Sequence, residues 1–189
     1  MKRMNLGAIA LIALASPAFA HTGAGTHFAF VDGFTHPLLG LDHLLAMVGV
    51  GLWAALVGGK ARWLWPVAFV TVMTAGGALA LNDIAMPYVE ALILASVVGI
   101  GAAVAFGLRL PLAVGAAICA AFAIAHGHAH GADLPAGASA LGYVAGFGVA
   151  TASLHAIGIG AGMWLQRSPR LARMAGTVIA ATGALLAFA

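Results

Sequence analysis

Residues 37–57 read PLLGLDHLLAMVGVGLWAALV, an apolar stretch of membrane-spanning length that contains one carboxylate and one imidazole. About 20 apolar residues allow a helix to cross the hydrocarbon core of a bilayer. An ionisable side chain such as Asp42 is costly inside such a helix unless it is paired or used. The stretch therefore predicts a membrane helix that carries functional residues.

The rest of the chain has the same apolar character. Of its 189 residues, 63% are hydrophobic and 7% are charged, which is too apolar for a soluble domain of this size. Five further apolar segments follow with only short polar breaks, so we predict an all-α integral membrane protein with six transmembrane helices in one domain, residues 21–189. The five segments are residues 63–81, 87–106, 110–125, 138–165 and 171–189.

The N-terminus reads as an export signal. Lys2 and Arg3 precede an apolar stretch at residues 6–15, and Ala18-Phe19-Ala20 forms a small-residue cleavage site. We predict that residues 1–20 are a cleaved signal peptide. An uncleaved first membrane helix is the alternative, against which the short apolar stretch argues.

The basic residues of the remaining chain indicate its orientation. They fall only in or beside the connections that follow the first, third and fifth segments, whereas Asp83 and Asp133 fall in the opposite connections. Cytoplasmic loops are enriched in lysine and arginine, so we predict a bacterial inner-membrane protein whose mature N-terminus is periplasmic. The basic residues are Lys60, Arg62, Arg109, Arg167, Arg170 and Arg173.

Composition and motifs exclude several functions. The net charge of +3 includes Lys2 and Arg3, and the mature chain has six basic and five acidic residues, so no nucleic-acid partner is indicated. The single cysteine, Cys119, allows neither a disulfide framework nor a multi-thiolate metal centre. The sequence contains no phosphate-binding loop and no complete dinucleotide fingerprint.

The first apolar segment begins with His36-Pro37 and continues to Asp42-His43. On a regular helix, residues seven apart share a face and lie roughly 10 Å apart along the axis. His36 and His43 would then be successive metal positions, unless the first turn is unwound. Asp42 would coordinate directly or orient a histidine. The alternative is an Asp–His pair that only holds helices together.

The fourth segment ends in His126-Gly127-His128-Ala129-His130-Gly131, which we place on the outer face of the membrane. His126 and His130 can share one metal ion if the helix continues that far, because residues four apart lie on one face. The two glycines favour an unwound histidine-rich loop, which would still attract metal. A plain solvated loop is the alternative.

Three more residues are candidates. His155 lies deep in the fifth segment with Thr151 one turn before it, either as an inner metal position or as a hydrogen-bonding bridge between helices. Glu90 begins the third segment as a ligand or as an interfacial carboxylate. Cleavage after Ala20 would give His21 both an imidazole and a free α-amine, which together can chelate a metal ion.

Aromatic residues cluster near the ends of the segments. We interpret them as anchors at the membrane–water interface, where amphipathic rings are enriched. They are Trp63, Trp65, Tyr88 and Trp164.

The donor types indicate the class of ion. Imidazole and carboxylate together favour nickel, cobalt or zinc, and the absence of thiolates argues against copper(I). The ion would be a transported substrate, and no prosthetic group is expected.

At these residues the sequence resembles the HupE/UreJ family. The first motif is His36-Pro37 with Gly40-Leu41-Asp42-His43 and Met47, followed by the residue 126–131 stretch and by Gly146-Phe147 leading to Thr151 and His155. This resemblance implies a nickel permease, with cobalt as the second ion, that imports metal from periplasm to cytoplasm in connection with hydrogenase or urease maturation. It implies no enzyme activity.

Two other functional classes stay open. One is a membrane metal-binding or assembly protein that serves hydrogenase or urease maturation without transport, against which the deep His155 argues. The other is an intramembrane metallohydrolase, which would need a general base beside an open metal site.

Overall fold

A computed structural model describes residues 28–188, and this part of the chain is helical without strands. The predicted signal peptide and His21 lie outside the described residues. All six predicted apolar segments are helical, and the first of them is divided between two helices, so that the described chain has seven. The helices are α2 (Ala29–Leu39), α3 (Leu41–Val57), α4 (Ala61–Leu81), α5 (Val89–Ala105), α6 (Leu112–Ala132), α7 (Ala140–Leu165) and α8 (Pro169–Leu186).

Several helices are long and apolar enough to cross a membrane, so the chain is a multi-pass membrane protein. These are α4, α6 and α7, and the bent pair α2–α3 is a fourth if it forms one span. The helix α5 is apolar but has only 17 residues, and α8 carries Arg170 and Arg173 near its start. The all-helical class is confirmed, whereas the number of six spans stays a prediction.

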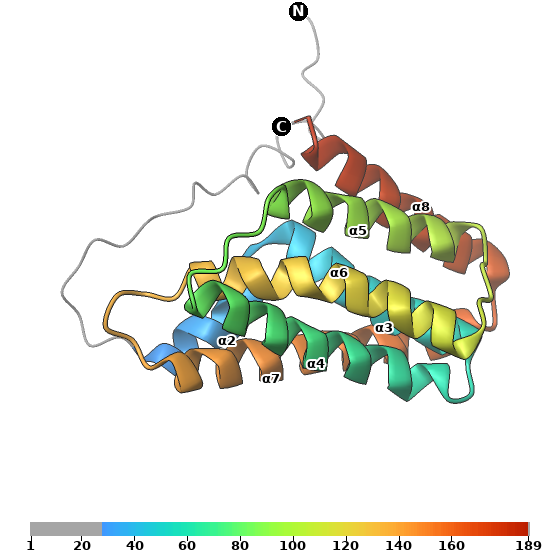
Figure 1. Cartoon of the computed structure of the whole chain (residues 1–189). Coiled ribbons are helices and arrows are strands. Elements are labelled where there is room, and N and C mark those ends of the chain that lie inside the picture. The colour runs from blue at the N-terminus through green and yellow to red at the C-terminus, as the bar shows by residue number, and fades with distance from the viewer. Residues whose placement is uncertain (1–27, 189) are drawn as a thin grey trace, which may run out of the picture.

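The helices pack side by side in pairs (Figure 1). The main contacts join α4 to α6, α3 to α7, α5 to α8 and α2 to α7. The connections α3–α4, α5–α6 and α7–α8 lie at one end of the bundle, and α4–α5 and α6–α7 lie at the other. All basic residues of the described chain therefore gather at the first end, in or beside those three connections.

The first predicted segment is not one regular helix. It begins at Ala29, eight residues earlier than expected, and breaks at Gly40 with a bend of 82° between α2 and α3. Gly40 is extended, with φ −84° and ψ 114°. A Cβ atom there would lie 2.9 Å from Asp42 Oδ1 and 3.2 Å from His43 Nδ1, so glycine leaves room for these two side chains at the bend.

The fourth segment does not end at residue 125. The helix α6 continues through the histidines to Ala132, so the expected loop at Gly127 and Gly131 is wrong. These glycines lie where α6 meets α4, because a Cβ at Gly127 would collide with the carbonyl of Met73 and one at Gly131 with that of Gly77. They serve close helix packing, as small residues do in membrane bundles.

Trp65 is not an interfacial anchor. Its side chain is fully buried, and its Nε1–H donates a hydrogen bond to the carbonyl oxygen of Leu112 at 2.9 Å. Its ring packs on that of Trp53, with 4.6 Å between centroids. A tryptophan at the interface can place its N–H in contact with water, whereas the N–H of Trp65 already has a hydrogen-bond partner inside the bundle. Trp63, Tyr88 and Trp164 are exposed, as expected of anchors.

Candidate functional site

Four histidine rings from three helices form a continuous row, which we call the histidine file. The ring of His130 lies 4.9 Å from that of His36 and 4.7 Å from that of His43, between centroids. The ring of His43 lies 4.8 Å from that of His126. The order His36, His130, His43, His126 therefore joins α2, α6 and α3.

The bend at Gly40 brings His36 and His43 together. Their ring centroids are 6.2 Å apart, much closer than the spacing expected along a regular helix. The interpretation based on a straight helix is wrong, and the alternative of an unwound first turn is wrong as well, because His36 lies in the last turn of α2 and the chain breaks only at Gly40. The break therefore shapes the candidate site directly.

The histidines of α6 face the interior. His126 and His130 are fully buried inside the bundle, and α6 is continuous through both, which meets the condition for their i, i+4 spacing. Their place on the outer side of the membrane and a metal ion shared between them stay predictions. The glycines of α6 pack tightly on α4, and the rings of these two histidines contact those of His36 and His43. His128 is only partly buried, and its Nε2 hydrogen-bonds the carbonyl oxygen of Ile84 at 2.9 Å, away from the file.

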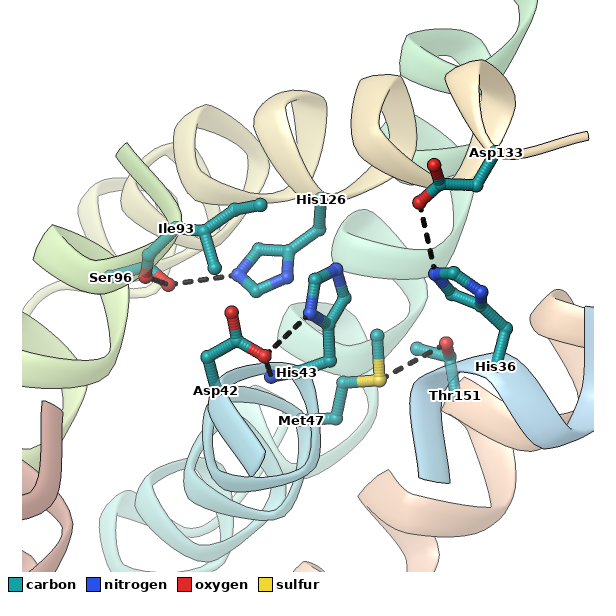
Figure 2. Close-up of polar contacts among 9 residues, drawn as sticks. All are labelled: His36, Asp42, His43, Met47, Ile93, Ser96, His126, Asp133 and Thr151. Atoms are coloured by element: carbon teal, nitrogen blue, oxygen red, sulfur yellow. Dashed lines mark hydrogen bonds and ion pairs between the residues drawn. The ribbon is translucent and has the colours of Figure 1, made fainter. Parts of the chain in front are cut away.

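The carboxylate of Asp42 orients the ring of His43 (Figure 2). Asp42 Oδ1 accepts the backbone N–H of His43 at 2.7 Å and lies 2.9 Å from its Nδ1. A carboxylate only accepts hydrogen bonds, so Nδ1 carries a proton, and in the neutral imidazole Nε2 keeps a lone pair. That Nε2 is buried and has no hydrogen-bond partner among the described residues.

Ser96 orients His126 in the same way (Figure 2). The Ser96 hydroxyl donates its only hydrogen to the carbonyl oxygen of Ile93 at 2.6 Å. It must therefore accept from Nε2 of His126, which lies 2.8 Å away. The lone pair of His126 is then on Nδ1, which is buried without a partner in the part of the chain that the structure describes.

His155 continues the row on the far side of one aromatic ring. The ring of Phe69 lies 5.5 Å from that of His126 and 5.1 Å from that of His155. Nδ1 of His155 donates to the carbonyl oxygen of Met47 at 2.7 Å, so Nε2 holds the lone pair. This Nε2 is also buried without a partner within residues 28–188.

The other end of the file is more polar. His36 Nε2 lies 3.3 Å from Asp133 Oδ2, an exposed carboxylate in the α6–α7 connection (Figure 2). Both ring nitrogens of His130 and the buried hydroxyl of Tyr143 lack hydrogen-bond partners in the described chain. His130 instead stacks on Phe147 at 5.0 Å between ring centroids.

The donors do not surround one point. Within the described residues, no group of three or more His, Cys, Asp and Glu side chains has the arrangement to hold a metal ion in this conformation. These histidine rings therefore contact one another in succession and do not surround a single metal position.

Glu90, like His128, stands apart from the file, and several contacts were not predicted. Glu90 is exposed in the first turn of α5, and no hydrogen bond or ion pair among the described residues joins it to the file. Sequence reasoning missed Ser96, although a lone hydroxyl in an apolar segment is a usable signal. It also missed Phe69 and Tyr143, because inward-facing aromatic residues look the same as core residues in a sequence.

Comparison with known proteins agrees with the motifs. The family described as HupE / UreJ protein matches residues 9–186. The chain is 46% identical over 179 residues to Protein HupE of Rhizobium leguminosarum bv. viciae, covering 93% of this chain and 94% of that protein. No solved structure matches. The protein therefore belongs to the HupE/UreJ family.

Proposed function

We propose that the protein is a permease that imports a divalent transition-metal ion, nickel first and cobalt second, along the histidine file and past His155. One observation supports this most strongly. His43, His126 and His155 each use one ring nitrogen to bond the protein and hold the other, with its lone pair, buried and unpaired.

This arrangement is costly for a protein that only needs to fold. A buried polar atom without a partner costs about 1–3 kcal/mol. Histidines that bind metal characteristically donate their second N–H to a carboxylate, a backbone carbonyl or water, which fixes the tautomer and the ring orientation. A serine hydroxyl can accept in the same way. The three rings match that pattern with three different acceptors, so their purpose is to present lone pairs to an ion.

The spacing of the rings suits transfer. Conduction requires binding that is favourable enough for entry and weak enough for release, commonly through several neighbouring positions. A row of rings less than 5 Å apart gives each ion a next donor close to the last one. A tight chelating centre would instead retain the ion.

The direction follows from the charges at the ends of the bundle. The basic end faces the cytoplasm under the positive-inside rule. The Asp133 end, where His36 and Asp133 meet, then faces the periplasm and receives the ion. The path runs from His36 through the file to His155. Nickel as the preferred ion comes from the family resemblance, which also connects import to hydrogenase or urease maturation.

A membrane metal-binding or assembly protein without transport activity is the second candidate. Reconstituted liposomes decide between them, because this chain alone must then move radioactive nickel inside. Nickel, cobalt and zinc would be compared, with empty liposomes and a His43→Ala, His130→Ala variant as controls. Binding to the protein without accumulation inside the liposomes would overturn the permease proposal.

A further inference from the structure

Two methionines and one threonine meet between the histidine file and His155. Thr151 Oγ1 lies 3.2 Å from the sulfur of Met47 and 3.5 Å from the sulfur of Met73. All three residues are fully buried and come from three helices, α7, α3 and α4. Figure 2 shows the sulfur of Met47 between His43 and Thr151.

Each of the three residues is one helical turn from a residue of the path. Met47 follows His43 by four residues, and Thr151 precedes His155 by four, so each pair shares a helix face. Met73 follows Phe69 by four residues in the same way, and Phe69 contacts both His126 and His155. The sulfur pair therefore lies at the level where the outer histidines end and His155 begins.

The hydroxyl of Thr151 behaves differently from others in these helices. A hydroxyl in a membrane helix usually bonds the carbonyl one turn earlier, which satisfies it locally. Four hydroxyls here do so, those of Thr35, Thr74, Ser153 and Thr177. Thr151 instead faces two thioethers, which are weak acceptors, so stability alone gives little reason for a polar group at this place.

We propose that Met47, Met73 and Thr151 form a neutral binding position that selects soft and borderline cations over hard ones. Thioether sulfur favours soft and borderline metals, whereas magnesium, calcium and manganese favour carboxylate, carbonyl and water oxygens. A hydroxyl can rotate, so Oγ1 offers a lone pair to a cation that arrives between the sulfurs. With no charged group in the set, the ion is held weakly and moves on to Nε2 of His155. This inference rests on the proposed function.

Methionine-to-leucine substitutions test it, because leucine keeps nearly the same volume and removes only the sulfur. Initial rates of radioactive nickel and manganese uptake would be measured in liposomes containing the wild type or the Met47→Leu, Met73→Leu double variant. We expect the ratio of nickel to manganese uptake to fall by about tenfold. Met163→Leu is the matched control, because Met163 is exposed on α7 and should leave the ratio unchanged.

The ratio separates selectivity from stability. A folding defect lowers both rates and leaves their ratio unchanged, and an unchanged ratio in the double variant would overturn the inference. If that variant does not accumulate, Thr151→Val and Thr151→Ser decide, since valine must lower the ratio and serine must preserve it. The inference would be overturned if Thr151→Val and Thr151→Ser had the same ratio of nickel to manganese uptake, whether lowered or unchanged. Wild-type liposomes that accumulate no metal would instead reject the permease function itself.

Discussion

Nδ1 of His155 lies 2.7 Å from the carbonyl oxygen of Met47, so this hydrogen bond links α7 to α3 and sets the tautomer of the ring. The lone pair is left on Nε2, in a buried position without a partner in the described chain. The two nitrogens of His155 therefore have separate tasks. One holds the ring in place and the other is available to an ion, and this separation can be tested.

Asparagine at position 155 keeps the hydrogen bond to Met47 and removes the nitrogen that would bind an ion. Its amide nitrogen occupies nearly the position of Nδ1, so His155→Asn can still donate to the Met47 carbonyl. We expect normal amounts of protein in the membrane, near wild-type thermal stability in detergent, and uptake lowered by at least about tenfold. His155→Ala, which loses both nitrogens, should lower stability as well.

The result would count against His155 as a ligand if the asparagine variant transported nickel at the wild-type rate. The bond to Met47 would then be the whole purpose of this histidine. Stability measured beside uptake is needed, because a loss of both would not distinguish the two tasks.

Ser96 has a positioning role that Ser96→Ala should reveal. The alanine leaves the Nε2–H of His126 without its acceptor in a fully buried place, which costs about 1–3 kcal/mol. The ring also loses the contact that keeps its lone pair on Nδ1. We expect reduced thermal stability and a several-fold loss of nickel uptake, and Ser96→Thr should restore part of both because it keeps the hydroxyl.

Ser153→Ala is the control for that experiment. Ser153 is exposed on α7, and its hydroxyl bonds the carbonyl of Val149 in its own helix. Its loss should change neither uptake nor stability measurably. Equal effects of the Ser96 and Ser153 substitutions would show that the contact between Ser96 and His126 has no role in positioning the ring.

Much of this fold follows from local pattern, and the departures have physical causes. The apolar segments predicted helices, because a helix forms all its backbone hydrogen bonds within one segment, as a membrane-spanning segment must unless it belongs to a closed barrel. The break at Gly40 was not predicted, since it depends on the room that Asp42 and His43 need at the bend. Gly127 was read as a loop signal, but its meaning depends on the approach of α4, which local sequence does not contain.

The candidate site divides in the same way. His43 and His155 were predicted because ionisable residues are rare in membrane helices. The contact between His36 and His130 was not, because it requires the 82° bend and the inward turn of α6 together. Sequence spacing describes neighbours on one helix, whereas the file is made between helices.

Helix packing at Gly158 should be essential for the contact between Met47 and His155. A Cβ there would collide with the carbonyl of Val48 and lie 3.0 Å from the backbone nitrogen of Leu52, so Gly158→Ala forces α7 away from α3. Overpacking of this kind costs about 1–3 kcal/mol. We expect lower thermal stability and loss of most nickel uptake.

Gly160→Ala is the matched control, because nothing lies within 4 Å of a Cβ at that position. Alanine is the better helix former by about 1 kcal/mol, so this variant should be as stable as the wild type or more so. If the Gly158 variant were equally stable and active, the close contact of the two backbones would not be required.

The two ends of the bundle make the orientation testable with single cysteines. Ala85 and Ala136 are exposed in the α4–α5 and α6–α7 connections, whereas Ser168 lies in the α7–α8 connection among the basic residues. Native Cys119 is buried and should not react, so the wild type supplies the unlabelled background. Because the lysines and arginines retain their end of the bundle in the cytoplasm, an impermeant maleimide on intact cells should label Ala85→Cys and Ala136→Cys but not Ser168→Cys. After permeabilisation all three should react, which confirms that Ser168→Cys is accessible in itself.

Labelling of Ser168→Cys alone on intact cells would reverse the orientation and with it the direction of import. Different labelling of Ala85→Cys and Ala136→Cys would mean that α5 and α6 do not both cross the membrane, and the six-span arrangement would then be wrong.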